Sequence, residues 1–381
     1  MLSRRAVILQ GVASAVEARR AAAHPLTSEF PSWSDDSLNA AAARIGVAYG
    51  TAVNITPLRN DAGYAQAISR ECGIVVAENE MKMEYVEPTN GKVSFAGGDE
   101  IRDFADRHRM RLRGTTLVWH RGMPAWADAR INPREAEDFL IRWIRLIAGR
   151  YKGEIDSWDV VNEIIDPRAG RPDGLRPTAW LKALGPRYID LAFHVLRETD
   201  PTAAGLWNED DVDLGADWME TRRTVVLRNL EGLLKRGVPV RRFGLQSHLN
   251  SLISLDARRL RRFLADIAAM GVAIEITELD VDDRAFPADI RERDKGVADC
   301  ARRFLDVVLD EPSVLNVLTW DIIDENTWLN TSAQRRRRDG LPQRSLPLGK
   351  GYVRKPLWAA LRQAFMDAPN HALTRQHLRG V

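Results

Sequence analysis

The sequence is poor in cysteine and in the short motifs that bind metals or nucleotides. Its 381 residues include two cysteines, Cys72 and Cys300, whose spacing fits neither a metal site nor a redox pair. We expect two free, buried thiols, although spacing alone leaves open whether they pair. No G-x-G-x-x-G follows the first predicted strand, and no G-x-x-x-x-G-K-[ST], H-x-H or H-E-x-x-H occurs. These absences argue against a nucleotide-binding fold and predict neither a metal nor a cofactor.

The sequence also lacks an excess of charge of one sign and lacks long apolar runs. The formal net charge of +2 gives no reason to expect a nucleic acid or a membrane as partner, and no apolar stretch is long enough to span a bilayer. With 45% hydrophobic and 28% charged residues, the composition is typical of a soluble globular protein with a sizeable core. Eleven tryptophans stand out, because flat aromatic faces suit sugars, although most of them are expected in the core.

The N-terminus, M-L-S-R-R-A-V-I-L-Q, resembles a twin-arginine export signal. The arginine pair precedes a short apolar run, and the alanines at 21–23 offer a cleavage site. A glutamine and several charges interrupt this pattern. We therefore predict that residues 1–24 are the signal segment of a periplasmic or secreted protein, or else a disordered basic tail of a cytoplasmic one. Residues 366–381 are predicted to form a C-terminal tail.

From about residue 45, short β-branched or apolar runs alternate with longer segments in which apolar residues recur every three or four positions. This alternation is typical of parallel strands joined by helices. Eight such units predict an α/β fold, a (β/α)₈ TIM barrel, in a single domain over residues 40–365. The predicted strands are 44–53, 73–78, 111–119, 157–163, 203–209, 242–249, 272–280 and 314–321.

In such a barrel the functional site lies at the C-terminal ends of the strands. Nearly every predicted strand ends in polar or aromatic side chains that can hydrogen-bond a polyol or stack on it. Singly, each has an ordinary explanation, such as a solvated loop charge or a structural histidine, but together they predict one polar site. These residues are Glu78, Asn79, Lys82, Trp119, His120, Asn162, Glu163, Asn208, Glu209, Gln246, His248, Glu278, Asp280 and Trp320.

Two of these carboxylates, Glu163 and Glu278, lie on the fourth and seventh predicted strands, roughly opposite each other around the ring. The mouth of an eight-stranded barrel is narrow enough for long side chains to approach across it. Without a metal motif or a nucleophilic Ser or Cys, two carboxylates favour acid/base or glycosyl-transfer chemistry. Asn162 and Glu163 are adjacent, so both reach the site only if the strand ends or bulges there. Asp280 is two positions after Glu278 on the same predicted strand, so both side chains can face the same side of the sheet.

The residues around both carboxylates resemble those of family 10 glycoside hydrolases, the endo-β-1,4-xylanases. W-D-V-V-N-E at 158–163 is similar to the family's acid/base motif, and I-T-E-L-D at 276–280 to its nucleophile motif. G-L-Q-S-H-L, E-N-E-M-K and L-V-W-H add further matches, and the resemblance runs from roughly residue 40 to 365. It implies an endo-acting enzyme that hydrolyses xylan, a polysaccharide partner, with retention of anomeric configuration. We expect a monomer.

By this resemblance, Glu278 is the nucleophile and Glu163 is the general acid and then the base. His248 is expected to hydrogen-bond Glu278 and to be oriented by Asp280, while Asn162 is expected to bind the sugar 2-hydroxyl. The other substrate-binding residues that the resemblance implies are Glu78, Asn79, Lys82, Trp119, His120, Gln246, Trp320 and Trp328.

Some positions depart from the family pattern. Thr115 stands where a sugar-binding histidine is usual, Gly122 where a hydrogen-bonding side chain is usual, and Asp210 where an aromatic residue is common on the leaving-group side. The eighth strand has W-D in place of W-G. These changes leave the catalytic pair intact but leave the exact glycan open. The basic run 335–338, which we expect to be a solvated loop, and Arg121 favour a glycan with acidic side groups.

Two alternatives from other classes remain. Rewritten subsites are compatible with a glycan-binding pseudoenzyme, because fold and motif never prove turnover. The retained carboxylates and their histidine–aspartate support argue against it. A metal-dependent barrel hydrolase would use His120, His248 and Asp280, but no metal-binding spacing supports it.

Overall fold

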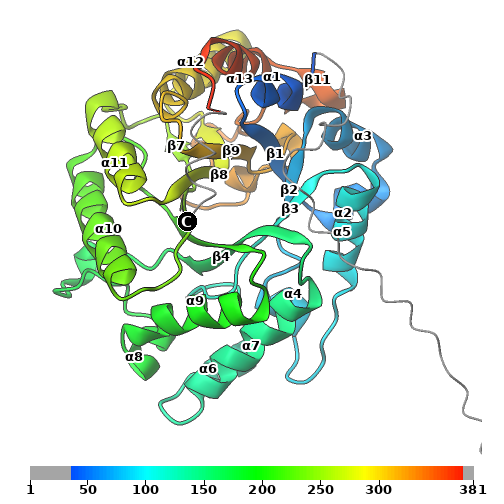
Figure 1. The fold of residues 1–381 in the computed structure, drawn as a ribbon. Helices are drawn as coiled ribbons and strands as arrows, with labels where there is room; N and C mark the ends of the chain where they lie inside the picture. The colour runs from blue at the N-terminus through cyan, green and yellow to red at the C-terminus, as the bar shows by residue number, and fades with distance from the viewer. Residues whose placement is uncertain (1–35, 372–381) are drawn as a thin grey trace, which may run out of the picture.

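The computed structural model describes residues 36–371, so the predicted signal segment and most of the predicted C-terminal tail lie outside the described residues. Eight parallel strands form a closed barrel, because β1 pairs with β9 and β6 pairs with β8. Helices surround the barrel as a ring (Figure 1). The predicted (β/α)₈ fold is thus confirmed. The barrel strands are β1 (Ala48–Val53), β2 (Ile74–Ala77), β3 (Arg111–Gly114), β4 (Ile155–Asn162), β5 (Ala204–Glu209), β6 (Arg242–Leu245), β8 (Ala273–Asp282) and β9 (Val314–Thr319).

Several of the surrounding helices bury an apolar stripe. In α7, for example, Phe139, Trp143 and Ile147 recur at helical spacing and are buried. No helix among residues 36–371 has both the length and the apolar character needed to cross a membrane. The helices are α1 (Leu38–Arg44), α2 (Ile55–Asn60), α3 (Ala62–Glu71), α4 (Met83–Val86), α5 (Ala96–Arg107), α6 (Ala125–Arg130), α7 (Ala136–Arg150), α8 (Ala179–Leu184), α9 (Arg187–Thr199), α10 (Asp217–Lys235), α11 (Ala257–Ala269), α12 (Ile290–Val308) and α13 (Pro356–Asp367).

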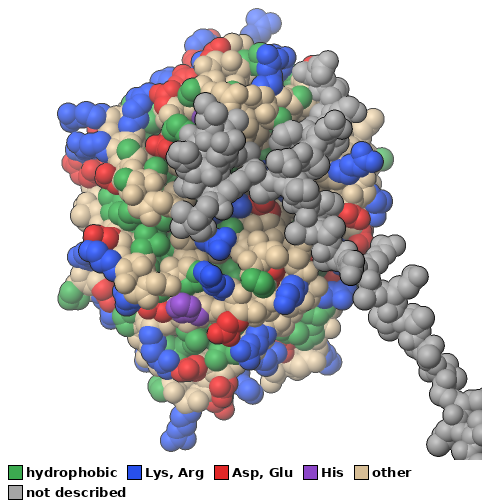
Figure 2. All heavy atoms as spheres, in the orientation of Figure 1, with side chains coloured by type: hydrophobic (Ala, Val, Ile, Leu, Met, Phe, Trp, Pro, Cys, Tyr) green, Lys and Arg blue, Asp and Glu red, His purple; other side chains and the backbone are tan. Residues whose placement is uncertain are grey.

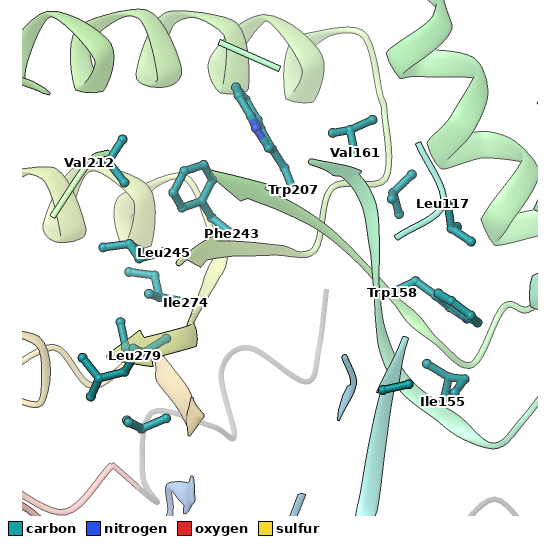
Figure 3. Packing of buried hydrophobic residues seen from close by; sticks show 14 of the residues in the cluster. Leu117, Ile155, Trp158, Val161, Trp207, Val212, Phe243, Leu245, Ile274 and Leu279 are labelled. Atoms are coloured by element: carbon teal, nitrogen blue, oxygen red, sulfur yellow. The ribbon is translucent and has the colours of Figure 1, made fainter. Parts of the chain in front are cut away.

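Aromatic side chains fill the layer between the barrel and the helices. Trp207 on β5 and Phe243 on β6 lie side by side, with ring centroids 5.5 Å apart (Figure 3). Phe263 on α11 packs edge-on against Phe243 at 5.8 Å. Each buried ring removes a large apolar area from water, which stabilises the contact between strand and helix. On the outer surface, basic and acidic side chains are interspersed over the face that Figure 2 shows, in keeping with a net charge near zero.

The inside of the barrel is charged near the beginnings of the strands. Arg113 on β3 pairs with Asp159 on β4 at 2.6 Å and with Glu275 on β8 at 2.7 Å. Arg242 on β6 joins Glu275 to Asp156 on β4. Arg113 and Glu275 are wholly buried. A charge in such a place is costly unless it is paired, so the set stabilises the barrel only when it is complete.

Arg113→Met is therefore expected to lower the free energy of unfolding by about 3–5 kcal/mol, because it leaves the buried Asp159 without its ion-pair partner. Arg59→Met is the matched control, since Arg59 pairs with Glu100 on the surface and the loss of an exposed pair is expected to have little effect on stability. Chemical unfolding curves of the two variants measure the difference. Equal losses in the two variants would contradict a structural role for the buried ion pairs.

Two strands, β3 and β6, end well before their predicted ends at residues 119 and 249. The ladder between β3 and β2 stops at Arg113, and from Thr115 onward the chain leaves β2 and follows β4, where Leu117 N–H donates to the Asp159 carbonyl at 2.9 Å. The predicted strand 242–249 breaks at Ser247, whose φ of +64° is left-handed and incompatible with extended pairing. A separate short strand, β7 (His248–Asn250), then pairs with the end of β8.

Two further expectations need correction. The basic run 335–338 is not wholly solvated, because Arg337 is buried and pairs with Asp283 at 3.1 Å and Asp339 at 2.6 Å. Both cysteines are free, as predicted, and Cys72 is buried, but Cys300 is only partly buried.

Candidate active site

A cavity of about 560 Å³ opens where the barrel strands end. It is built from residues of many strands and of the loops that follow them, as expected for a (β/α)₈ barrel. Most of the residues predicted from the sequence line it, whereas His120, Asn208, Glu209 and Asp280 do not. The predicted residues that line this cavity, called the catalytic cleft below, are Glu78, Asn79, Lys82, Trp119, Asn162, Glu163, Gln246, His248, Glu278, Trp320 and Trp328.

Glu163 reaches the cleft because β4 ends just before it. The strand stops at Asn162, and Glu163 adopts a left-handed φ of +52°. This change of backbone direction brings two adjacent side chains to the same cavity, which a regular strand would separate. Gln246 holds both, since its Nε2 lies 3.2 Å from Asn162 Oδ1 and 3.2 Å from Glu163 Oε1.

The surroundings of Glu163 favour its protonated form. Burial raises the pKa of the Glu163 carboxyl, and the negative charge of Asp210 raises it further. Glu278 contributes a smaller effect in the same direction. A carboxyl with a raised pKa can keep its proton near neutral pH and donate it to a bound ligand.

Glu278 has the opposite surroundings, because hydrogen-bonding groups face both of its oxygens. Asn208 Nδ2 donates to Oε1 at 2.8 Å, and His248 Nε2 lies 3.1 Å from Oε2. Asp280 accepts from His248 Nδ1 at 2.9 Å and from Trp328 Nε1 at 2.7 Å. Burial alone would lower the pKa of His248, but the charge of Asp280 and its hydrogen bonds raise it to about 10. A protonated imidazole therefore stabilises a negative charge on Glu278.

His120 does not line the cleft, and its Nε2 lies 3.9 Å from Glu163 Oε2. Burial, with smaller effects from Arg176 and Arg121, lowers the pKa of His120 to about 4. The imidazole is therefore neutral near pH 7, and it supplies no positive charge that would favour ionisation of Glu163.

One side of the cleft combines a cation with aromatic faces. Lys82 Nζ donates to Asn79 Oδ1 at 3.0 Å, and it lies 5.3 Å from the Trp119 ring centroid and 5.8 Å from that of Trp320. Asn54 Nδ2 donates to Glu78 at 2.9 Å and orients that carboxylate. Aromatic faces beside fixed hydrogen-bonding groups suit the apolar faces and the hydroxyls of a sugar ring.

The opposite side of the cleft is charged. Arg222 is buried and contacts both Glu209 and Asp210, of which only Asp210 lines the cleft. Glu209, read from the sequence as a strand-end polar group, is wholly buried and accepts from the Ile164 backbone N–H at 3.1 Å. It therefore supports the loop that follows β4 and does not face a ligand.

Sequence reasoning assigned no role to two residues that hold the carboxylates in place. Asn208 was recognised only as a strand-end polar residue, although it donates to Glu278. Arg176 follows β4 by 14 positions, and its Nε donates to the Glu163 carbonyl at 2.7 Å. The N-E sequence repeated at the ends of β4 and β5 is a signal for Asn208, but no local pattern identifies Arg176. Within residues 36–371, no group of three or more histidine, cysteine or acidic side chains is placed to hold a metal ion.

Two carboxylates of contrasting environment in one cleft, at the strand ends of a (β/α)₈ barrel, form the arrangement that glycoside hydrolases use. The family model described as Glycosyl hydrolase family 10 matches residues 37–364. The chain belongs to this family, as its sequence motifs predicted.

Relatives and solved structures agree with this assignment. Endo-1,4-beta-xylanase B of Paenibacillus barcinonensis is 30% identical over 333 residues, 82% of this chain and 93% of the relative. Endo-1,4-beta-xylanase C of the same organism is also 30% identical over 78% of this chain, but the match covers only 29% of that longer protein. Native xylanase 10B from Thermotoga maritima superposes with a TM-score of 0.78 at 26% identity, over 91% of this chain and 100% of that one. Xylanase 10B from Thermotoga petrophila RKU-1, solved with xylobiose, gives a TM-score of 0.78 at 26% identity, over 86% and 97% of the two chains.

Proposed function

We propose that this protein hydrolyses internal β-1,4-xylosidic bonds of xylan by double displacement, with Glu278 as nucleophile and Glu163 as acid and base. The observation that carries the proposal is the contrast between the two carboxyl groups of one cleft. Burial and like charge favour the proton on Glu163, whereas Asn208 and His248 stabilise negative charge on Glu278. The relatives named above as endo-1,4-beta-xylanases, and the related structure that holds xylobiose, support xylan as the substrate.

In the first step, a Glu278 oxygen attacks the anomeric carbon while Glu163 gives its proton to the glycosidic oxygen. The bond to the leaving sugar breaks, and a glycosyl ester forms on Glu278. Asn162 is proposed to hold the sugar 2-hydroxyl, a contact that strengthens as positive charge develops on the ring. Gln246 fixes Asn162 and Glu163 together, so the acid and the proposed sugar contact keep a constant geometry.

In the second step, Glu163 takes a proton from water, and the resulting hydroxide attacks the anomeric carbon and releases Glu278. The ester has no negative charge, so one of the charges that raise the pKa of Glu163 is gone once the ester has formed. The same carboxylate that served as acid can then serve as base. Two inversions give net retention.

The charge of Asp210 is expected to raise the pH above which activity falls. Glu163 must be protonated for the first step, and after burial the charge of Asp210 is the next cause that raises the Glu163 pKa. Asp210→Asn removes that charge, so the alkaline limb of kcat/KM should move to lower pH, by about 0.5–1 pH unit. Asp210→Glu keeps the charge and should keep the limb in place. Full pH profiles of the three proteins measure the shift, and a limb that does not move in Asp210→Asn contradicts this account.

The substrate is tested by product analysis on unsubstituted β-1,4-xylan beside cellulose. Cellulose is included because a relative with 29% identity is named Exoglucanase XynX from Acetivibrio thermocellus. Early release of mixed xylo-oligosaccharides is expected, with little sugar from cellulose. Cleavage of cellulose alone would overturn the assignment to xylan, and binding of both glycans without cleavage would support the pseudoenzyme.

A further inference from the structure

We infer that a basic pocket beside the catalytic cleft binds a carboxylate-bearing side group, a uronic acid, on the glycan chain. This inference rests on the proposed function, because it describes the substrate cleaved in the neighbouring cleft. The basic pocket is a separate cavity of about 630 Å³. The residues that carry the argument line it: Leu252, Arg284, Gln334, Arg336, Arg337 and Arg338.

The basic pocket adjoins the catalytic cleft on the side of the nucleophile. Gln334 lines both cavities, and Arg335 lines the cleft while the next residue lines the basic pocket. Arg284 fixes this boundary, since it donates to the Gln334 carbonyl at 2.6 Å and to Asp282 at 2.7 Å. Asp282 is the last residue of β8, the strand that carries Glu278. A side group on a sugar bound in the cleft can therefore extend into this pocket.

Hydrogen bonds within the protein hold the wall of the basic pocket in place. Arg337 is buried and donates to the Asp283 carbonyl at 2.6 Å, to the Phe286 carbonyl at 3.0 Å and to Asp339 at 2.6 Å. Gln343 Nε2 donates to the Arg335 carbonyl at 2.6 Å. These contacts within the protein fix the course of the segment, which lowers the entropic cost of binding a ligand there.

The charges that line the basic pocket are not balanced. Arg284 pairs with Asp282, and Arg337 pairs with Asp283 and Asp339. Arg336 and Arg338 are exposed, and neither forms an ion pair with any carboxylate of residues 36–371. The only acidic residue among those lining the pocket is Asp339, which Arg337 already holds.

A uronic acid matches both the available positive charge and the exposed apolar surface of the basic pocket. A guanidinium binds a carboxylate through two parallel charged hydrogen bonds, and Arg336 and Arg338 both have their charges available. Leu252, 62% exposed, gives an apolar surface for the C–H face of the sugar ring. A neutral side group would gain only the apolar contact. This places the acidic-glycan preference on Arg336 and Arg338, not on the whole basic run.

The test compares three xylo-oligosaccharides of equal backbone length, which are unsubstituted, glucuronyl-substituted and arabinosyl-substituted. Arg336→Gln/Arg338→Gln is expected to lower kcat/KM on the glucuronyl substrate about fivefold to tenfold relative to the other two. The control is Arg107→Gln/Arg197→Gln, an equal loss of charge on exposed side chains of α5 and α9, where the preference should stay unchanged. In the wild type, the preference for the glucuronyl substrate should weaken as salt is added.

If the pocket variant keeps the preference for the glucuronyl substrate, the inference is overturned. An equal loss of this preference in the control variant also overturns it, because it would indicate steering by net charge. A loss on the glucuronyl and arabinosyl substrates alike would assign the pocket to shape, not to the carboxylate, and also overturns it. If the wild type cleaves none of the three, the proposed function fails. Calorimetric affinities of Glu278→Gln, with and without the two pocket substitutions, for the same oligosaccharides then decide the inference separately.

Discussion

Glu278→Ala is expected to abolish hydrolysis of xylan, with a fall in kcat of about 10⁵-fold, because it removes the carboxylate that is proposed to form the glycosyl ester. The Asn208 and His248 donors would then face an empty space. A small anion such as azide is expected to enter that space and restore part of the turnover of an activated aryl xyloside. The restored product should be a glycosyl azide of opposite anomeric configuration, because only one displacement has taken place.

Initial rates with and without azide, and the configuration of the azide product, measure this outcome. An unchanged unfolding curve shows that the variant is folded. A loss of less than about 100-fold on xylan would contradict the role of Glu278, since misplacement of the substrate by about 1 Å can alone cost about that much.

Glu163→Ala is expected to show a loss that depends on the leaving group. On xylan, whose departing sugar alkoxide needs a proton, the rate of the first step should fall about 10³- to 10⁴-fold. On a dinitrophenyl xylobioside, whose phenolate leaves unprotonated, the same step should fall by only about tenfold or less. The alkaline limb of the pH profile should disappear in the variant, because the group that must be protonated is gone.

Single-turnover rates on the two substrates measure this difference. The conservative variant Glu163→Gln is the matched control for shape, since it keeps the side-chain volume and should show the same dependence on leaving group. Equal losses on both substrates would indicate that Glu163 positions the substrate and does not donate a proton.

The barrel was predictable because its signals are local. Alternating β-branched runs and helical segments marked all eight strands, and the polar residues at their ends marked the mouth of the cleft. Glu163 and Glu278 could be paired because strand order fixes which ends face each other. The adjacent Asn162 and Glu163 predicted that β4 either ends or bulges there, and the structure shows that the strand ends at Asn162.

Other features depend on contacts between distant residues and could not be predicted. The strand breaks at Ser247 because the backbone there is left-handed. A glycine at or beside this position would have suggested such a conformation, but the sequence has none there. Arg176 donates a hydrogen bond to the Glu163 carbonyl across a loop. The buried Arg337 donates to Asp283, which lies 54 positions earlier. A run of four arginines looks uniform in sequence, yet only the packing of that loop decides which of them keep free charges.

The stereochemistry of hydrolysis tests the central claim most directly. Proton NMR of a xylo-oligosaccharide digest, recorded in the first minutes before mutarotation, shows the anomer that the enzyme releases. Double displacement through Glu278 predicts that the β-anomer appears first and the α-anomer grows in later. Initial release of the α-anomer would mean a single displacement by water, and would contradict the assignment of Glu278 as a covalent nucleophile.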